Sequence, residues 1–162
     1  MKTLILSCNT GEGHNSCAKA IKEYYDTVGD ECVIKDGLEF ISPKVSNFIS
    51  WGHTFIYRHL PLLFKYGYVY IEKHPTMFKE GSFAYRFITR GTERMYTCIC
   101  DEQYDIIICT HVFASLMLTD MLKKHPMNQP TALVSTDYTC SPSTKDSNLD
   151  YYFIPDDEFA TD

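Results

Sequence analysis

A histidine stands directly after a glycine-rich turn near the start of the chain, in the run Gly11-Glu12-Gly13-His14. A histidine side chain has an ordinary pKa near 6.5, so one that lies next to a substrate hydroxyl can remove its proton at neutral pH. The glycines allow the backbone to approach a ligand closely, and a helix that begins here would point free amides toward an anion. The motif predicts a base for alcohol chemistry, and the competing interpretation is a histidine that only hydrogen-bonds the turn.

The same turn matches nucleotide-binding motifs only in part. The dinucleotide fingerprint G-x-G-x-x-G fails at its third position, which is Ser16. Asp36, 25 residues after Gly11, could still take the place of the acid that binds ribose, so a nucleotide-binding domain stays open as an alternative. A phosphate-binding loop is excluded because no Gly-Lys-Ser/Thr follows, and no spacing of Cys and His predicts a metal site.

Short apolar segments alternate with helical patterns along the chain. The strands are expected at residues 3–8, 31–35, 105–109, 131–136 and 151–154. The helices are expected from residue 15 or 16 to 28, then at 45–60, 82–98 and 113–124, with Pro61 ending or kinking the second of them. This order predicts one α/β domain over residues 1–162, a Rossmann-like, doubly wound and mainly parallel sheet with helices on both faces.

Polar residues follow the ends of the expected strands. Because ligands bind outside the carboxyl ends of the strands in such sheets, we expect these residues to form one site. The glycine turn contributes its residues after the first strand, and the third and fourth strands add two residues each. The candidate site residues are Thr10, Gly11, Glu12, Gly13, His14, Asn15, Thr110, His111, Asp137 and Tyr138.

Basic and aromatic side chains gather between the second and third strands. The whole chain has a net charge of -6, but residues 43–94 carry eight basic and three acidic side chains and 12 of the 23 aromatic ones. Basic charge mixed with Trp and Tyr suits the surface of an anionic membrane, whereas a helical layer with ordinary core aromatics is the competing interpretation. The net charge of -6 for the whole chain argues against a nucleic-acid partner, whose phosphates need a basic surface. The residues expected to face the membrane are Trp51, Phe55, Arg58, Phe64 and Lys65.

The sequence also bears on the compartment. Seven cysteines, an odd number without a secretory signal before them, indicate reduced thiols rather than a disulfide framework. No apolar stretch is long enough to span a bilayer. We therefore expect a cytoplasmic protein that lies on the membrane surface.

Four blocks of the sequence together resemble one family. They are residues 4–21, which contain Thr10-Gly11-Glu12-Gly13-His14, and residues 105–113, 134–138 and 150–155. In this order they resemble the amino-terminal domain of the monogalactosyldiacylglycerol synthases and processive diacylglycerol glucosyltransferases. The resemblance implies the amino-terminal half of a GT-B glycosyltransferase, in which residues 43–94 form a helical insertion and the donor domain is absent.

The resemblance also implies a reaction. The family transfers galactose or glucose from a UDP-sugar to diacylglycerol with inversion at the anomeric carbon, and without a metal or another cofactor. His14 takes the position of the base, Asp137 could orient it, and the other candidate site residues would bind the acceptor. A donor domain, in cis or in trans, would hold most of the UDP-sugar, so we expect this chain to be inactive alone. A non-catalytic module that binds membrane lipid is the main alternative.

Overall fold

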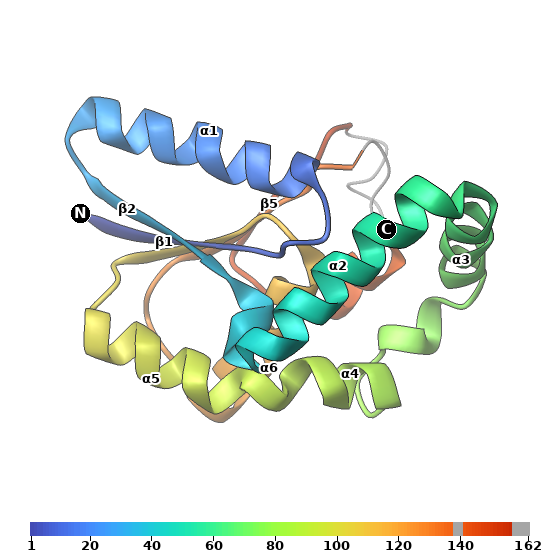
Figure 1. Ribbon diagram of the computed structural model, residues 1–162. Coiled ribbons are helices and arrows are strands. Elements are labelled where there is room, and N and C mark those ends of the chain that lie inside the picture. Colours follow the sequence, from blue (N-terminus) through green and yellow to red (C-terminus); the bar gives the residue numbers. More distant parts are fainter. Residues whose placement is uncertain (138–140, 157–162) are drawn as a thin grey trace.

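The computed structural model describes residues 1–137 and 141–156, and it contains a five-stranded parallel sheet between layers of helices (Figure 1). The strand order is β2-β1-β3-β4-β5, and every neighbouring pair runs parallel. The strands are β1 (Lys2–Ser7), β2 (Glu31–Asp36), β3 (Ile106–Cys109), β4 (Thr131–Val134) and β5 (Tyr151–Phe153). The α/β fold with a Rossmann-like sheet is therefore confirmed.

Helices cover both faces of this sheet. Helix α1 (Glu12–Val28) lies on one face, and α5 (Thr92–Glu102) and α6 (Val112–Lys124) lie on the other (Figure 1). Alternate residues of β1 point to opposite faces: Ile5 packs with Ala18 of α1, whereas Leu4 and Leu6 join the larger core under α5 and α6. Burial on both faces explains why the central strands read as continuous apolar runs.

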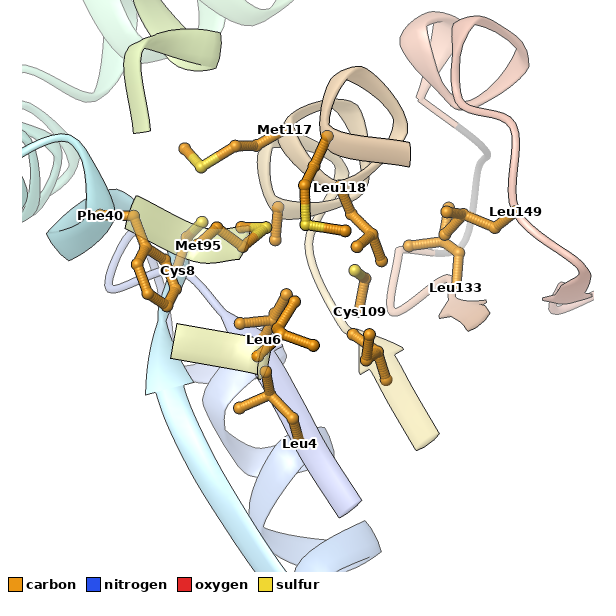
Figure 2. Close-up of a cluster of buried hydrophobic side chains, with 14 of the residues drawn as sticks. Leu4, Leu6, Cys8, Phe40, Met95, Cys109, Met117, Leu118, Leu133 and Leu149 are labelled. Atoms are coloured by element: carbon orange, nitrogen blue, oxygen red, sulfur yellow. The ribbon is translucent and has the colours of Figure 1, made fainter. Parts of the chain in front are cut away.

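The larger core also contains thiols. Cys8 and Cys109 are fully buried in it, beside Leu6 and Leu118 (Figure 2). Burial raises the pKa of both thiols well above the ordinary value, so they stay protonated and pack as small apolar side chains. All six cysteines among the described residues are free of disulfides.

The insertion between β2 and β3 is helical, as expected, but its helices differ from the expected ones. Its elements are α2 (Pro43–His59), α3 (Pro61–Lys73), a 3₁₀ turn (Pro75–Phe78), α4 (Phe83–Ile88), a second 3₁₀ turn (Thr89–Gly91) and the start of α5. We call α2 and α3, residues 43–73, the arm. Figure 1 shows the arm on the side of the domain where β1 ends and α1 begins.

Two of these differences have clear local causes. Pro61 was expected to end or kink a helix, and it does end α2, but it also begins α3, because proline suits the first position of a helix. The single helix expected over residues 82–98 is wrong. The chain there is split by the turn Thr89–Gly91 into α4 and α5, since Gly91 packs directly against the backbone of Phe40 and Ile41.

The arm is fastened to the sheet by Asp36, the last residue of β2. One of its carboxylate oxygens accepts a hydrogen bond from the backbone N–H of Leu38 (2.9 Å), and the other accepts one from the hydroxyl of Ser46 in α2. The hydroxyl of Ser42 caps α2 by accepting from the N–H of Val45 at 3.1 Å. One carboxylate oxygen of Asp36 thus holds the 3₁₀ turn Gly37–Phe40 and the other holds α2 of the arm, so both oxygens have a structural role.

Candidate active site

A cavity of about 520 Å³ lies between the carboxyl ends of the strands and the arm. We call its two sides the strand-end wall and the arm wall. The strand-end wall is mostly polar and includes Thr10, Gly11, Gly13, His14, Thr110, His111, Thr136 and Asp137. The arm wall is mostly apolar and includes Ile49, His53, Phe64, Tyr68, Ile71 and Glu72. Phe78, Phe113 and Leu133 extend the apolar lining, so the cavity is polar at one side and apolar at the other.

His14 is held by two groups that come from other strands. Its Nδ1 lies 2.8 Å from the carbonyl oxygen of Thr110, after β3, and 2.6 Å from Oγ1 of Thr136, after β4. A carbonyl oxygen can only accept, so Nδ1 carries the proton and donates it. Nε2 therefore has a lone pair, and it has no hydrogen-bond partner among residues 1–137 and 141–156. The ring is oriented as a base requires, with the accepting nitrogen free.

His111 supports the turn that presents His14. Its Nδ1 accepts a hydrogen bond from the N–H of Phe113 at 3.0 Å and so caps α6, which leaves the proton on Nε2, where it is donated to Oγ1 of Thr10 at 2.9 Å. Burial lowers the pKa of His111 well below its ordinary value, and the nearby His14 and His53 lower it further. His111 is therefore neutral, and its ring lies edge-on to that of His14 with centroids 4.4 Å apart.

The glycine turn between β1 and α1 leaves space for a ligand. Gly11 is the N-cap residue of α1, and no side chain caps this helix. A Cβ atom placed on Gly11 or Gly13 would have no neighbour within 4 Å, so the space beside both residues is open. Asn15 fixes the turn from behind, because it accepts a hydrogen bond from Ser7 (2.8 Å) and donates one to Asn9 (2.9 Å). Uncapped amides and open space make the turn a ligand-facing element.

The chain is similar to one known protein family. The family model described as monogalactosyldiacylglycerol (MGDG) synthase matches residues 14–162. The chain belongs to the MGDG synthase family. Membership in the MGDG synthase family implies a glycosyltransferase role in glycolipid synthesis. No curated protein and no solved structure matches the chain.

Within this MGDG synthase family domain, the structure brings most of the expected site residues together. Those that line the cavity are Thr10, Gly11, Gly13, His14, Thr110, His111 and Asp137. Glu12 and Asn15 lie outside the lining, because Glu12 starts α1 and Asn15 is bonded within the turn. Tyr138 lies outside the described residues. Asp137 is exposed, and the ring of His14 is held by Thr110 and Thr136.

The residues expected to face a membrane also fall into two groups, one exposed on the arm and one at the cavity. Trp51, Phe55, Arg58 and Lys65 are exposed on the arm. Phe64 is placed differently: it is half-buried, lines the cavity, and packs edge-to-face against Tyr57 and His53. The reason is the change of direction at Pro61, where α3 begins and places Phe64 against Tyr57 and His53 of α2.

Thr136 and His53 are among the residues of this MGDG synthase site that sequence reasoning missed. Thr136 directly precedes Asp137 at a strand end, so the rule that selected Asp137 could have selected it too. His53 lies in the middle of α2, and only the packing of the arm over the strand ends brings it to the cavity. Within the described ranges, no three His, Cys, Asp or Glu side chains gather closely enough to hold a metal ion.

Proposed function

We propose that this chain is the acceptor-binding domain of an inverting glycosyltransferase that moves galactose or glucose from a UDP-sugar to the free hydroxyl of diacylglycerol. The observation that carries the proposal is the lone pair on Nε2 of His14, which lines the cavity while Nδ1 is occupied by Thr110 and Thr136. The proposal goes beyond family membership, since it names a base, an acceptor and a stereochemical course.

The chemical step needs one base and one leaving group. The acceptor hydroxyl oxygen attacks the anomeric carbon from the face opposite to UDP, and its proton passes to Nε2 of His14. The bond between the anomeric carbon and the diphosphate oxygen breaks, and its electron pair leaves with UDP. Because Thr110 and Thr136 fix the ring through Nδ1, His14 does not have to reorient when it takes the proton.

The lining of the cavity supports diacylglycerol as the acceptor. A hydroxyl at the strand-end wall would meet His14, while acyl chains would contact the arm wall, for example Ile49, Phe64 and Ile71. A volume of about 520 Å³ lies in the range of sites for ligands of moderate size, roughly 300–1,000 Å³. We infer that the glycerol end enters the cavity and that the far ends of long acyl chains stay in the membrane.

The donor would be held by a second α/β domain, supplied in cis or in trans. No Lys or Arg is among the described residues that line the cavity, so nothing cationic there neutralises a diphosphate. We expect the isolated chain to show no sugar transfer from UDP-glucose or UDP-galactose to diacylglycerol vesicles, and transfer to appear when a donor domain is attached. Robust turnover by the isolated chain would refute the assignment of the donor site to a second domain. Inactivity of the two-domain protein would refute the proposed reaction.

The arm is the surface that we propose to contact the membrane from the cytoplasmic side. Its exposed apolar side chains include Phe48, Trp51, Tyr57, Leu62, Leu63 and Tyr66, and its basic ones are Lys44, Arg58, Lys65 and Lys73. Aromatic rings prefer the headgroup region, and Lys and Arg are attracted to anionic lipid. Among the described residues, no helix has the length and hydrophobicity to cross a bilayer. These features favour a protein that binds the membrane peripherally.

Replacing Lys65 by Gln is expected to weaken binding to vesicles that contain anionic lipid about fivefold, since one basic residue near such a surface contributes about 1 kcal/mol. The matched control is Lys19→Gln on α1, which removes a charge that is also exposed but lies outside the arm, and it should leave binding unchanged. Sedimentation with vesicles at low and high salt measures both variants. Equal losses in the two variants, or binding that ignores salt, would show that the arm is not an electrostatic contact surface.

A further inference from the structure

His53 is the one histidine on the arm wall of the cavity, and its hydrogen-bonding capacity is unused by the described residues. It is half-buried, and its ring packs edge-to-face against Phe64 with centroids 5.2 Å apart. No hydrogen bond joins its ring nitrogens to any residue within 1–137 and 141–156. A polar ring that lies in an apolar wall without a protein partner is stabilised when a ligand supplies the partner.

The charge state of His53 decides what it can bind. Burial lowers its pKa below the ordinary value, and the nearby His14 lowers it further, so the ring is neutral at pH 7. A neutral imidazole has one N–H donor and one acceptor nitrogen. His53 therefore offers a hydrogen bond without offering a positive charge, and it does so within electrostatic reach of the proposed base.

The rest of the lining disfavours an anionic ligand. Its charged side chains are the acids Glu72 and Asp137, and no Lys or Arg is among the described lining residues. A phosphate group in this cavity would lose water without gaining a cation, which is costly in a partly buried site. The uncapped start of α1 also lines the cavity, but with two acids and no Lys or Arg among the described lining residues the side-chain charges favour a ligand whose polar part is uncharged.

We propose that His53 determines acceptor specificity by donating a hydrogen bond to an ester carbonyl of an uncharged diacyl glycerolipid whose free hydroxyl lies at His14. The inference rests on the proposed function, because it takes the acceptor to be diacylglycerol. It adds that the ester linkage itself is recognised, and that a phosphorylated glycerolipid is rejected. Acceptor selection would thus depend on the arm wall, while proton removal depends on the strand-end wall.

The test is direct binding of soluble short-chain lipids to the 162-residue chain. Dihexanoylglycerol is compared with the matched dihexyl ether of glycerol, which lacks the ester carbonyls, and with dihexanoyl phosphatidate, by calorimetric titration. The unchanged chain should bind the ester about three- to tenfold more tightly than the ether, as expected for one net hydrogen bond. It should bind the phosphatidate at least about tenfold more weakly than the ester.

Three variants separate the role of His53 from its packing. His53→Leu should bind the ester as weakly as the ether, and His53→Asn, which keeps a donor, should retain part of the preference. His59→Leu is the control, because His59 is an exposed histidine on the same helix and lies outside the cavity lining. Circular dichroism checks that each variant is folded.

The outcomes distinguish this inference from the proposed function on which it rests. Equal affinity of the unchanged chain for ester and ether, or an ester preference that survives in His53→Leu, overturns the role of His53 and leaves the acceptor site intact. Tight binding of the phosphatidate overturns the selection against charge. If dihexanoylglycerol does not bind at all, both the proposed acceptor-binding function and this inference are refuted.

Discussion

Replacement of His14 by Gln is expected to lower sugar transfer to diacylglycerol by about 10²–10⁴-fold, the usual contribution of a general base. The reason is geometric: Thr110 and Thr136 occupy Nδ1, so only Nε2 of His14 can accept the proton of the acceptor. A glutamine amide can still donate to the Thr110 carbonyl, but it has no basic nitrogen. The measurement is turnover with diacylglycerol vesicles by a protein in which this chain is joined to, or mixed with, a donor domain.

The control for this experiment is His125→Gln at the end of α6, which changes a histidine outside both the cavity lining and the arm and should keep full activity. Binding of the His14→Gln variant to vesicles and to dihexanoylglycerol should stay close to normal, because the loss concerns proton transfer. A loss of less than about tenfold would make His14 a structural residue of the turn. A loss of lipid binding together with activity would make His14 a lipid-binding or structural residue rather than the base.

The sheet could be predicted well because its strands carry a strong local signal. Ile106, Ile107 and Ile108 form a β-branched run that suits a strand buried on both faces, and the structure buries it between α1 and the pair α5 and α6. Helix α1 was expected too, but its cap was placed at Asn15 or Ser16, four or five residues after the observed N-cap Gly11, and the side chains that pack on the sheet are Ala18, Ile21 and Tyr25. Asn15 looked like a cap, whereas its side chain is bonded to Ser7 and Asn9 and the helix begins at Glu12.

The strand-end wall of the site was predictable for a topological reason. The carboxyl ends of parallel strands lie at one edge, so Thr10, His14, Thr110 and His111 had to be neighbours once β1 and β3 were recognised. What the sequence could not reveal is which atoms pair. The contact between His14 and Thr136 joins residues 122 positions apart, and it depends on how far β4 runs before it ends.

The arm wall was not predictable, because it depends on how helices pack rather than on local pattern. His53, Phe64 and Ile71 reach the cavity only because α2 and α3 are placed beside the strand ends, with Phe64 of α3 against His53 of α2. The spacing of apolar residues in α2 is equally consistent with a helix that packs in an ordinary hydrophobic core and lines no cavity. Asp36 and Ser46 hold α2 in its place, and neither residue stands out in the sequence as a partner of the other.

The same packing makes Gly91 a sensitive position. A Cβ atom there would lie 2.8 Å from the backbone carbonyl carbon of Phe40, 2.9 Å from the nitrogen of Ile41 and 2.8 Å from the sulfur of Met117. The sulfur belongs to a flexible side chain, but the backbone of Phe40 and Ile41 cannot turn aside. Gly91→Ala is therefore expected to lower the free energy of unfolding by about 1–3 kcal/mol, the usual cost of overpacking, as measured by urea denaturation.

Gly67→Ala in α3 is the matched control for this prediction. The space beside Gly67 is open, and alanine favours a helix interior over glycine by about 0.5–1 kcal/mol, so this variant should be as stable as the unchanged chain or slightly more stable. The backbone of Gly91 is already right-handed helical, with φ -82° and ψ -5°, so alanine adopts it without strain and any loss measures the steric contact alone. If Gly91→Ala unfolds at the same urea concentration as Gly67→Ala, the close packing against Phe40 and Ile41 does not exclude a side chain at position 91.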